Sequence, residues 1–131
     1  MLGIDTNVLV RFLVHDDEAQ FLRAQKLIRR EIAAGRPVFV NLLVLLETEW
    51  VLRSRYDVSK VEVIAAISAL LNSVDVDIED EPAVEEALFL WKDHAVGFAD
   101  CLIGARNRRL GCSATMTFDA KAARIPGFAA A

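Results

Sequence analysis

The stretch "MLGIDTNVLVRFL" (residues 1–13) introduces the first element of the fold, an apolar run that is interrupted at Asp5. Residues 2–5 predict a short buried strand. A helix over Val8–Val14 can follow it, because Asp5 or Thr6 can accept hydrogen bonds from the free backbone N–H groups of a first helical turn. A carboxylate therefore stands where the first strand ends. Helix capping alone would explain a single acid at this place. Asp5 indicates a functional site only if acids interrupt apolar segments elsewhere in the chain as well.

The rest of the chain alternates strands with helices. Predicted strands cover residues 2–5, 37–40, 74–78 and 113–119, and predicted helices cover residues 8–14, 16–35, 41–56, 59–73, 81–97 and 98–111, with a short helix after the last strand. This alternation predicts an α/β fold with a mostly parallel sheet, in a single domain over residues 1–131. In such folds, functional groups gather beyond the carboxyl ends of the strands.

Composition narrows the class of protein. Hydrophobic residues make up 54% of the 131 residues and the mean hydropathy is +0.32, which excludes a disordered chain and suggests a thick core that could leave an apolar patch for a partner. No stretch predicts a membrane span, and Asp5 and Arg11 interrupt the first apolar run in a way that argues against a signal peptide. Cys101 and Cys112 are too few for a disulfide framework or a zinc site, so we expect a cytoplasmic protein.

Three further acids interrupt apolar segments as Asp5 does. Asp119 follows the last predicted strand, so it belongs at the same edge of a parallel sheet as Asp5. Glu47 and Asp100 each lie in a helix with apolar or small residues three and four positions away. A carboxylate that faces an interior is costly unless it is paired or bound to a metal. Glu49, whose helical neighbours include an arginine, is expected to turn toward solvent and is the weaker candidate.

The net charge of the chain equals the charge of these four acids. The formal net charge is −4, so without Asp5, Glu47, Asp100 and Asp119 the chain would be neutral. Four carboxylates without a suitably spaced histidine or cysteine suit a hard cation with oxygen ligands, Mg²⁺ or Mn²⁺. Each acid by itself also has a structural interpretation, as a helix cap, a turn residue or a member of an ion pair.

Four stretches carry a family resemblance: "IDTNVLVRFL" (4–13), "VFVNLLVLLETEWVLRSRY" (38–56), "VGFADCLIGA" (96–105) and "TMTFDAKAARIPGF" (115–128). In this order they resemble the motifs of the PIN-domain ribonucleases, and above all the VapC-type toxins of bacterial toxin–antitoxin pairs. Asn41 departs from the pattern, since serine is frequent there, but the acids are intact.

The resemblance implies a fold, an activity and partners. The fold is an α/β/α sandwich with a central parallel sheet, and the activity is endoribonuclease cleavage of RNA with Mg²⁺ or Mn²⁺. The implied partners are a cognate antitoxin and a second copy of the chain. The catalytic and metal-binding acids carry over to Asp5, Glu47, Asp100 and Asp119. We expect Asp5 and Asp100 to bind the metal directly, Glu47 to act through water or accept a proton, and Asp119 to complete the cluster.

Other polar residues are weaker candidates. Thr6 and Thr117 could position water or phosphate, although capping and strand propensity explain them equally well. An acidic protein that binds RNA needs local positive charge, and the arginines expected to contact the RNA backbone are Arg11, Arg53, Arg55, Arg106, Arg108 and Arg109. Solvation of helix ends is the alternative for each of them.

Two alternative functions stay open at this point. A PIN-like module could bind RNA or a partner without cutting, but such a module is expected to lose one or more of the acids. A metal-dependent phosphatase of the haloacid dehalogenase type also begins with an aspartate after a strand. That class needs a second acid two residues later, and this chain has Asn7 there. A phospho-acceptor receiver domain would be expected to carry its acceptor aspartate on a middle strand and a lysine later in the chain, and this sequence does not fit that pattern well.

Two apolar helical segments suggest a partner surface. Residues 42–46 are five consecutive aliphatics, and residues 63–71 are nearly as apolar. A helix that is apolar most of the way round must be covered on more than one side, so we expect these helices to bind an antitoxin segment or a second copy. Trp50, Trp91 and both cysteines are expected in the core.

Overall fold

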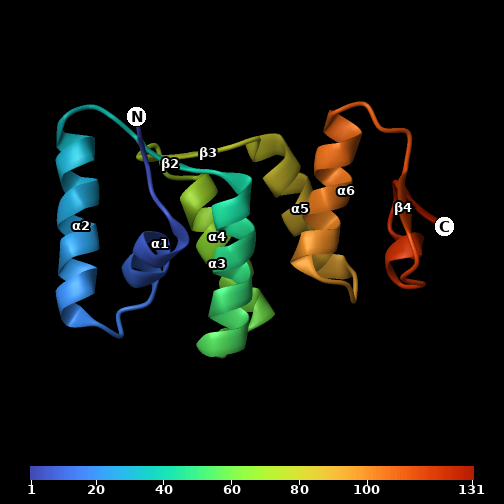
Figure 1. Ribbon diagram of the computed structural model, residues 1–131, viewed down its shortest axis with the longest axis horizontal. Helices are drawn as coiled ribbons and strands as arrows, with labels where there is room; N and C mark the ends of the chain where they lie inside the picture. The colour runs from blue at the N-terminus through green and yellow to red at the C-terminus, as the bar shows by residue number, and fades with distance from the viewer. The chain divides into compact units, whose positions relative to one another are not determined.

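The computed structural model describes residues 1–131 as two units, Met1–Glu79 and Asp80–Ala131, each with its own parallel β-sheet (Figure 1). The first unit contains β1 (Leu2–Gly3), α1 (Thr6–Leu13), α2 (Glu18–Ala33), β2 (Val38–Val40), α3 (Leu42–Arg55), α4 (Lys60–Leu71) and β3 (Val76–Ile78). The second contains α5 (Glu81–Asp93), α6 (Phe98–Arg109), β4 (Thr115–Thr117), the 3₁₀ helix η1 (Ala122–Arg124) and β5 (Phe128–Ala130).

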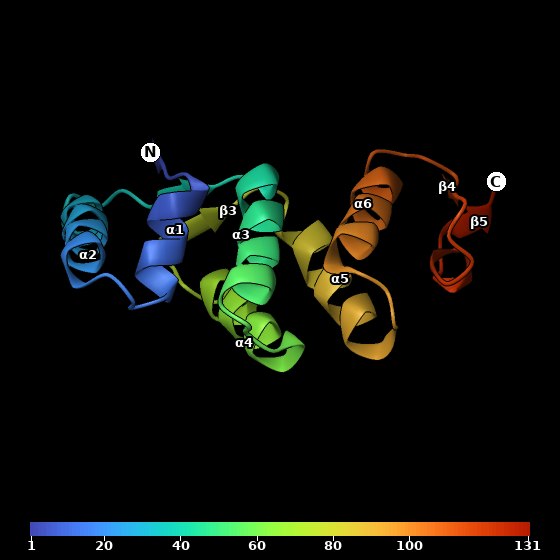
Figure 2. The same cartoon turned by 60° about the horizontal axis from the view of Figure 1, so that its bottom comes forward.

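The sheet of the first unit has the order β1-β2-β3, and both pairings are parallel. Parallel neighbours cannot be joined by a hairpin, so two helices connect β1 to β2 and two more connect β2 to β3. The central strand, β2, is the most buried: Val38 and Val40 have no exposed surface. Around the sheet, α1 contacts α2 and α3, and α3 lies beside α4 (Figure 2).

Every helix of the first unit begins at a side chain that caps it. The side-chain oxygens of Asp5, Asp17 and Asn41 accept hydrogen bonds from the backbone N–H three residues later, at 3.0, 3.0 and 2.9 Å. Ser59 and Glu62 cap α4 reciprocally. These contacts satisfy backbone donors that have no partner inside the helix.

In the second unit, α5 and α6 pack against each other, and β4 pairs with β5 in parallel. A methyl group added at Gly104 in α6 would lie 2.2 Å from the Phe128 ring of β5, so any larger residue there would force the ring to move. Asn107 of α6 donates to the Thr115 hydroxyl of β4 at 3.0 Å. These contacts join the helix to the two-stranded sheet.

The predicted α/β class with parallel strands is confirmed, with local corrections. All four predicted strands are shorter than predicted, and β5 was not predicted. The first strand was expected to be buried, but both residues of β1 are exposed. Trp50 is 54% exposed and Cys112 is exposed, so the expectation that they lie in the core is wrong, whereas Trp91 and Cys101 are buried as expected. The two cysteines form no disulfide. None of the helices combines the length and apolarity that a membrane crossing requires.

The cap of α3 gives a prediction for stability. Replacing Asn41 with alanine removes the acceptor for the Val44 N–H and should lower the free energy of unfolding by about 1 kcal/mol. Asn41→Ser keeps a capping oxygen and should stay close to the parent protein in urea unfolding. Equal loss in both variants would show that the amide acts through something other than the cap.

Candidate functional site

The carboxyl edge of the three-stranded sheet is lined by polar side chains. The last β1 hydrogen bond runs from the Ile4 N–H to the Phe39 carbonyl at 3.1 Å, so Asp5 is the first residue beyond the strand. Asn41 follows β2, and Glu79 follows β3. Since the pairings are parallel, all three residues lie at the same edge.

Asp5 has one carboxylate oxygen engaged and one without a hydrogen-bond partner. Oδ1 accepts from the Val8 N–H at 3.0 Å, and the residue is exposed. The predicted cap is therefore confirmed, and Oδ2 remains able to bind a cation or water. Thr6, the first residue of α1, is buried, which favours a structural role for its side chain.

Glu79 is a further acid of this edge, which the sequence analysis did not select. Its Oε1 accepts from the Leu42 N–H at 3.0 Å, and its own N–H donates to the Val40 carbonyl at 3.0 Å. Both contacts serve the start of α3 and the end of β2. An acid directly after a strand was the signal that could have identified it, as it did for Asp5.

The orientation of α3 corrects the sequence prediction. Glu47 is exposed, and it lies between exposed Leu43 and Trp50 on one face of the helix. Glu49 is only 3% exposed and pairs with Arg53, which donates from Nη2 to Oε1 at 3.1 Å and from Nε to Oε2. The expectation that Glu47 faces the apolar side and Glu49 faces solvent is therefore wrong. Glu47 lies five residues after Leu42, about 7.5 Å along the helix axis from the sheet edge.

The acids of the second unit lie at two other turns. Asp100 is half-buried in the first turn of α6, where the helix dipole favours a negative charge, and its carboxylate has no hydrogen-bond partner. Asp119 follows β4, and its Oδ1 accepts from the N–H groups of Lys121 and Ala122 at 2.8 and 3.3 Å. The Asp119 N–H donates to the Thr117 hydroxyl at 3.0 Å, which ties Thr117 to this turn.

Five of the six candidate arginines already bind carboxylates of their own unit. Arg11 contacts Asp16, Gln20 and the Tyr56 hydroxyl, and its hydrogen bond with Tyr56 is the main cause of its raised pKa. The other pairs are Arg53 with Glu49, Arg106 and Arg109 with Asp80, and Arg108 with Glu86. Arg55 is exposed and takes part in no ion pair. To bind phosphate, each paired arginine would have to share or leave its carboxylate.

Neither unit taken alone gathers three carboxylate, imidazole or thiol side chains into a group that could hold a metal ion. Asp5 and Glu47 belong to the first unit, and Asp100 and Asp119 belong to the second. Asp5 and Asp100 each keep at least one carboxylate oxygen without a hydrogen-bond partner. Glu47 is exposed, and its carboxylate has no hydrogen-bond partner either. Oxygen donors of this kind fit a hard divalent cation.

Comparison with known proteins identifies the class. The PIN domain family model matches residues 3–127, so the chain belongs to the PIN domain family. The matched residues cover most of each unit and include all four acids. The chain is also similar to a VapC ribonuclease of Aquifex aeolicus (strain VF5), with 24% identity over 115 residues, 88% of this chain and 84% of that protein. The family resemblance seen in the sequence is thereby confirmed.

The buried ion pair of α3 gives a second prediction. Arg53→Gln leaves the buried Glu49 carboxylate without its charged partner and should lower the free energy of unfolding by about 1–2 kcal/mol. Arg55→Gln, on the same helix but without an ion pair, should change it by less than about 0.5 kcal/mol. Chemical unfolding of both variants measures the difference, and equal values would mean that the pair does not stabilise α3.

Proposed function

We propose that this chain is a metal-dependent endoribonuclease that hydrolyses RNA phosphodiester bonds, and that it is the toxin of a type II toxin–antitoxin module in the cytoplasm. The observation that carries the proposal is the PIN domain match over residues 3–127, which contains Asp5, Glu47, Asp100 and Asp119 in the order of the family motifs. Similarity to a VapC ribonuclease supports the choice of RNA as substrate. The two units together would form one nuclease domain.

The proposed site holds Mg²⁺, or Mn²⁺ in its place. Asp5 and Asp100 would bind it directly, since each has an unengaged carboxylate oxygen, and Asp119 would complete the acidic cluster. The cation, when bound, neutralises charge on the scissile phosphate and makes an attacking water more acidic. Glu47 would accept the proton of that water, because it is exposed on α3 and takes part in no ion pair. Thr6 and Thr117 would support the turns that carry Asp5 and Asp119.

The capping role of Asp5 allows its charge to be tested apart from its hydrogen bond. Asp5→Asn keeps a good cap for α1, so the protein should unfold in EDTA at a temperature equal to or higher than the parent, while Mg²⁺-dependent cleavage of single-stranded RNA is abolished. Asp5→Ala should lose cleavage and also about 1 kcal/mol of stability. Full cleavage by Asp5→Asn would exclude Asp5 from catalysis, and absence of Mg²⁺-dependent cleavage by the parent would point to a module that binds without cutting.

A parallel test asks whether Asp100 binds the same cation. Carboxylates that share a cation repel one another without it, by up to about 3 kcal/mol at 5 Å and an effective dielectric near 20. Asp100→Asn should therefore melt no lower than the parent in EDTA, whereas Mg²⁺ should raise the melting temperature of the parent but of neither Asp100→Asn nor Asp5→Asn. Destabilisation of Asp100→Asn in EDTA with an intact Mg²⁺ response would make Asp100 structural.

The proposed partners are a cognate antitoxin and a second copy of the chain. The exposed face of α3 supports this proposal, because Leu43 is 76% exposed and Trp50 is 54% exposed. On α4 only Val61 is an exposed large aliphatic, so this helix is covered more fully than its composition predicted. Light scattering should give the mass of a dimer, and replacing Leu43 and Trp50 with glutamine should shift the protein toward monomer. A strict monomer for the parent would contradict the homodimer.

A further inference from the structure

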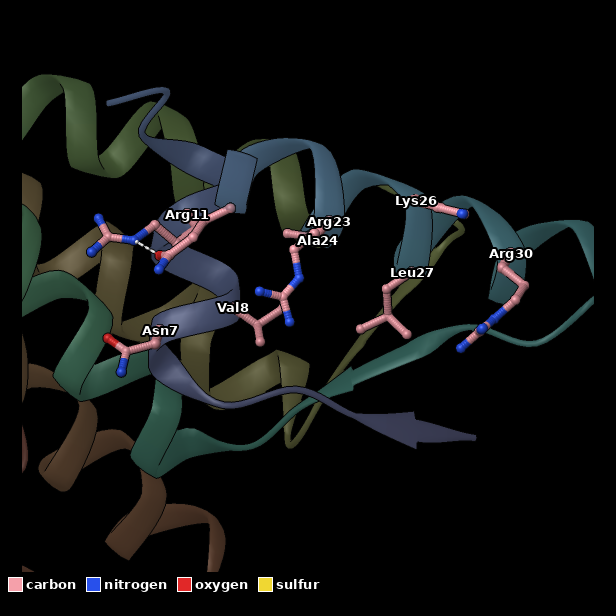
Figure 3. A pocket seen from close by; sticks show the side chains of 9 residues that line it. Asn7, Val8, Arg11, Arg23, Ala24, Lys26, Leu27 and Arg30 are labelled. Carbon is pink, nitrogen blue, oxygen red and sulfur yellow. Dashed lines mark hydrogen bonds between the residues drawn. The ribbon is translucent and has the colours of Figure 1, made fainter. Parts of the chain in front are cut away.

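An open cleft of about 560 Å³ lies between α1 and α2 in the first unit. Asn7, Val8 and Arg11 of α1 line one side, and Arg23, Leu27 and Arg30 of α2 line the other. Figure 3 shows Arg23 extending from α2 toward α1, with Leu27 and Arg30 on the same side of α2 and Lys26 at the outer edge. The cleft thus combines an apolar floor with cationic groups, and it contains no acid.

The α2 cations that line the cleft differ from the five paired arginines among those expected from the sequence. None of the ion pairs in the protein involves Arg23, Lys26 or Arg30, and Arg23 and Arg30 are exposed. Arg11, at the other wall, is fixed by Asp16, Gln20 and Tyr56. In a chain of net charge −4, Arg23, Lys26 and Arg30 give the lining of this cleft a local positive charge, which favours an anionic ligand.

Spacing and position indicate what kind of anion fits. Arg23 and Arg30 are seven residues apart, about 10.5 Å along the helix axis, so together they match a ligand with repeated charges better than a single small anion. The cleft begins at Asn7, two residues after Asp5. A chain of phosphates held by α2 would therefore pass close to the start of α1, where the proposed cation ligand lies.

We propose that the cleft between α1 and α2 binds the phosphate backbone of the single-stranded RNA substrate beside the cleavage site. Arg23 and Arg30 contact phosphates, and Val8 and Leu27 provide an apolar floor for the ribose and base. The proposal rests on the proposed ribonuclease function for the identity of the polyanion. It assigns substrate binding to residues that differ from the arginines expected from the sequence.

The test measures RNA binding without cleavage. Fluorescein-labelled oligouridylate is titrated with the protein in EDTA at several KCl concentrations, and binding is followed by anisotropy. Arg23→Gln/Arg30→Gln should lower the slope of log K against log[KCl] by about 1.4, or 0.7 for each lost phosphate contact, and weaken binding on the order of tenfold near 0.1 M salt. Arg23→Lys/Arg30→Lys retains the charges and should keep most of the slope.

Arg29→Gln is the matched control, because Arg29 is exposed on α2 and does not line the cleft. It should bind RNA as the parent does. Thermal unfolding of each variant checks that the fold is intact. Equal slopes for the Arg23→Gln/Arg30→Gln variant and the control would overturn the proposal. So would binding of oligoglutamate that depends on these arginines while RNA binding does not, since that result would assign the cleft to an acidic protein segment.

Cleavage of the same RNA with Mg²⁺ is measured in parallel to separate the two proposals. Cleavage by the parent together with unchanged slopes in the variants would overturn the cleft assignment alone. A reduced slope without any cleavage by the parent would support the cleft as an RNA-binding surface and overturn the nuclease activity.

Discussion

Parallel strand pairing is the constraint on which the first unit depends. Each parallel strand must be followed by a crossover, so the carboxyl ends of β1 and β2 lead directly into helices whose first N–H groups need acceptors. Asp5 supplies the acceptor for α1, and Asn41 and Glu79 together supply acceptors for α3. The edge where a parallel sheet offers a functional site is therefore also the edge where helix capping requires side-chain oxygens.

This coincidence explains why a cap and a catalytic acid were hard to separate in the sequence. A carboxylate has two oxygens, and a cap uses one of them. Asp5 and Asp119 both accept backbone hydrogen bonds through Oδ1 and retain Oδ2. The structural and functional interpretations of these residues are thus compatible. The hydrogen bond that caps α1 also holds the free oxygen of Asp5 in place, and the bonds of the turn before η1 do the same for Asp119.

The strands and helices were predictable because their signals are local. Apolar runs, capping residues and stop signals lie within a few positions of each element, and they located every helix. The rotation of α3 was not predictable, since apolar residues surround the whole helix and periodicity gives no preferred face. The buried pair of Glu49 with Arg53 and the burial of Leu45 and Leu52 set the rotation, and these depend on tertiary packing. The strand β5 was not predicted because the stretch "GFAA" (127–130) is too short to show the periodicity of a strand.

The charged residues show the same division between local and tertiary information. The sequence analysis selected six arginines as RNA contacts, but the sequence does not reveal which cations have carboxylate partners. Asp80 binds both Arg106 and Arg109, and Glu86 binds Arg108, so the densest basic run is largely neutralised within its own unit. Arg23, Lys26 and Arg30 are spread along α2 and form no ion pair. A cation already paired gives up that interaction when it binds phosphate, whereas an unpaired one gives up only water. Binding a polyanion would therefore cost the α2 cations less than it would cost the paired arginines, although the paired arginines are the ones that the sequence analysis selected.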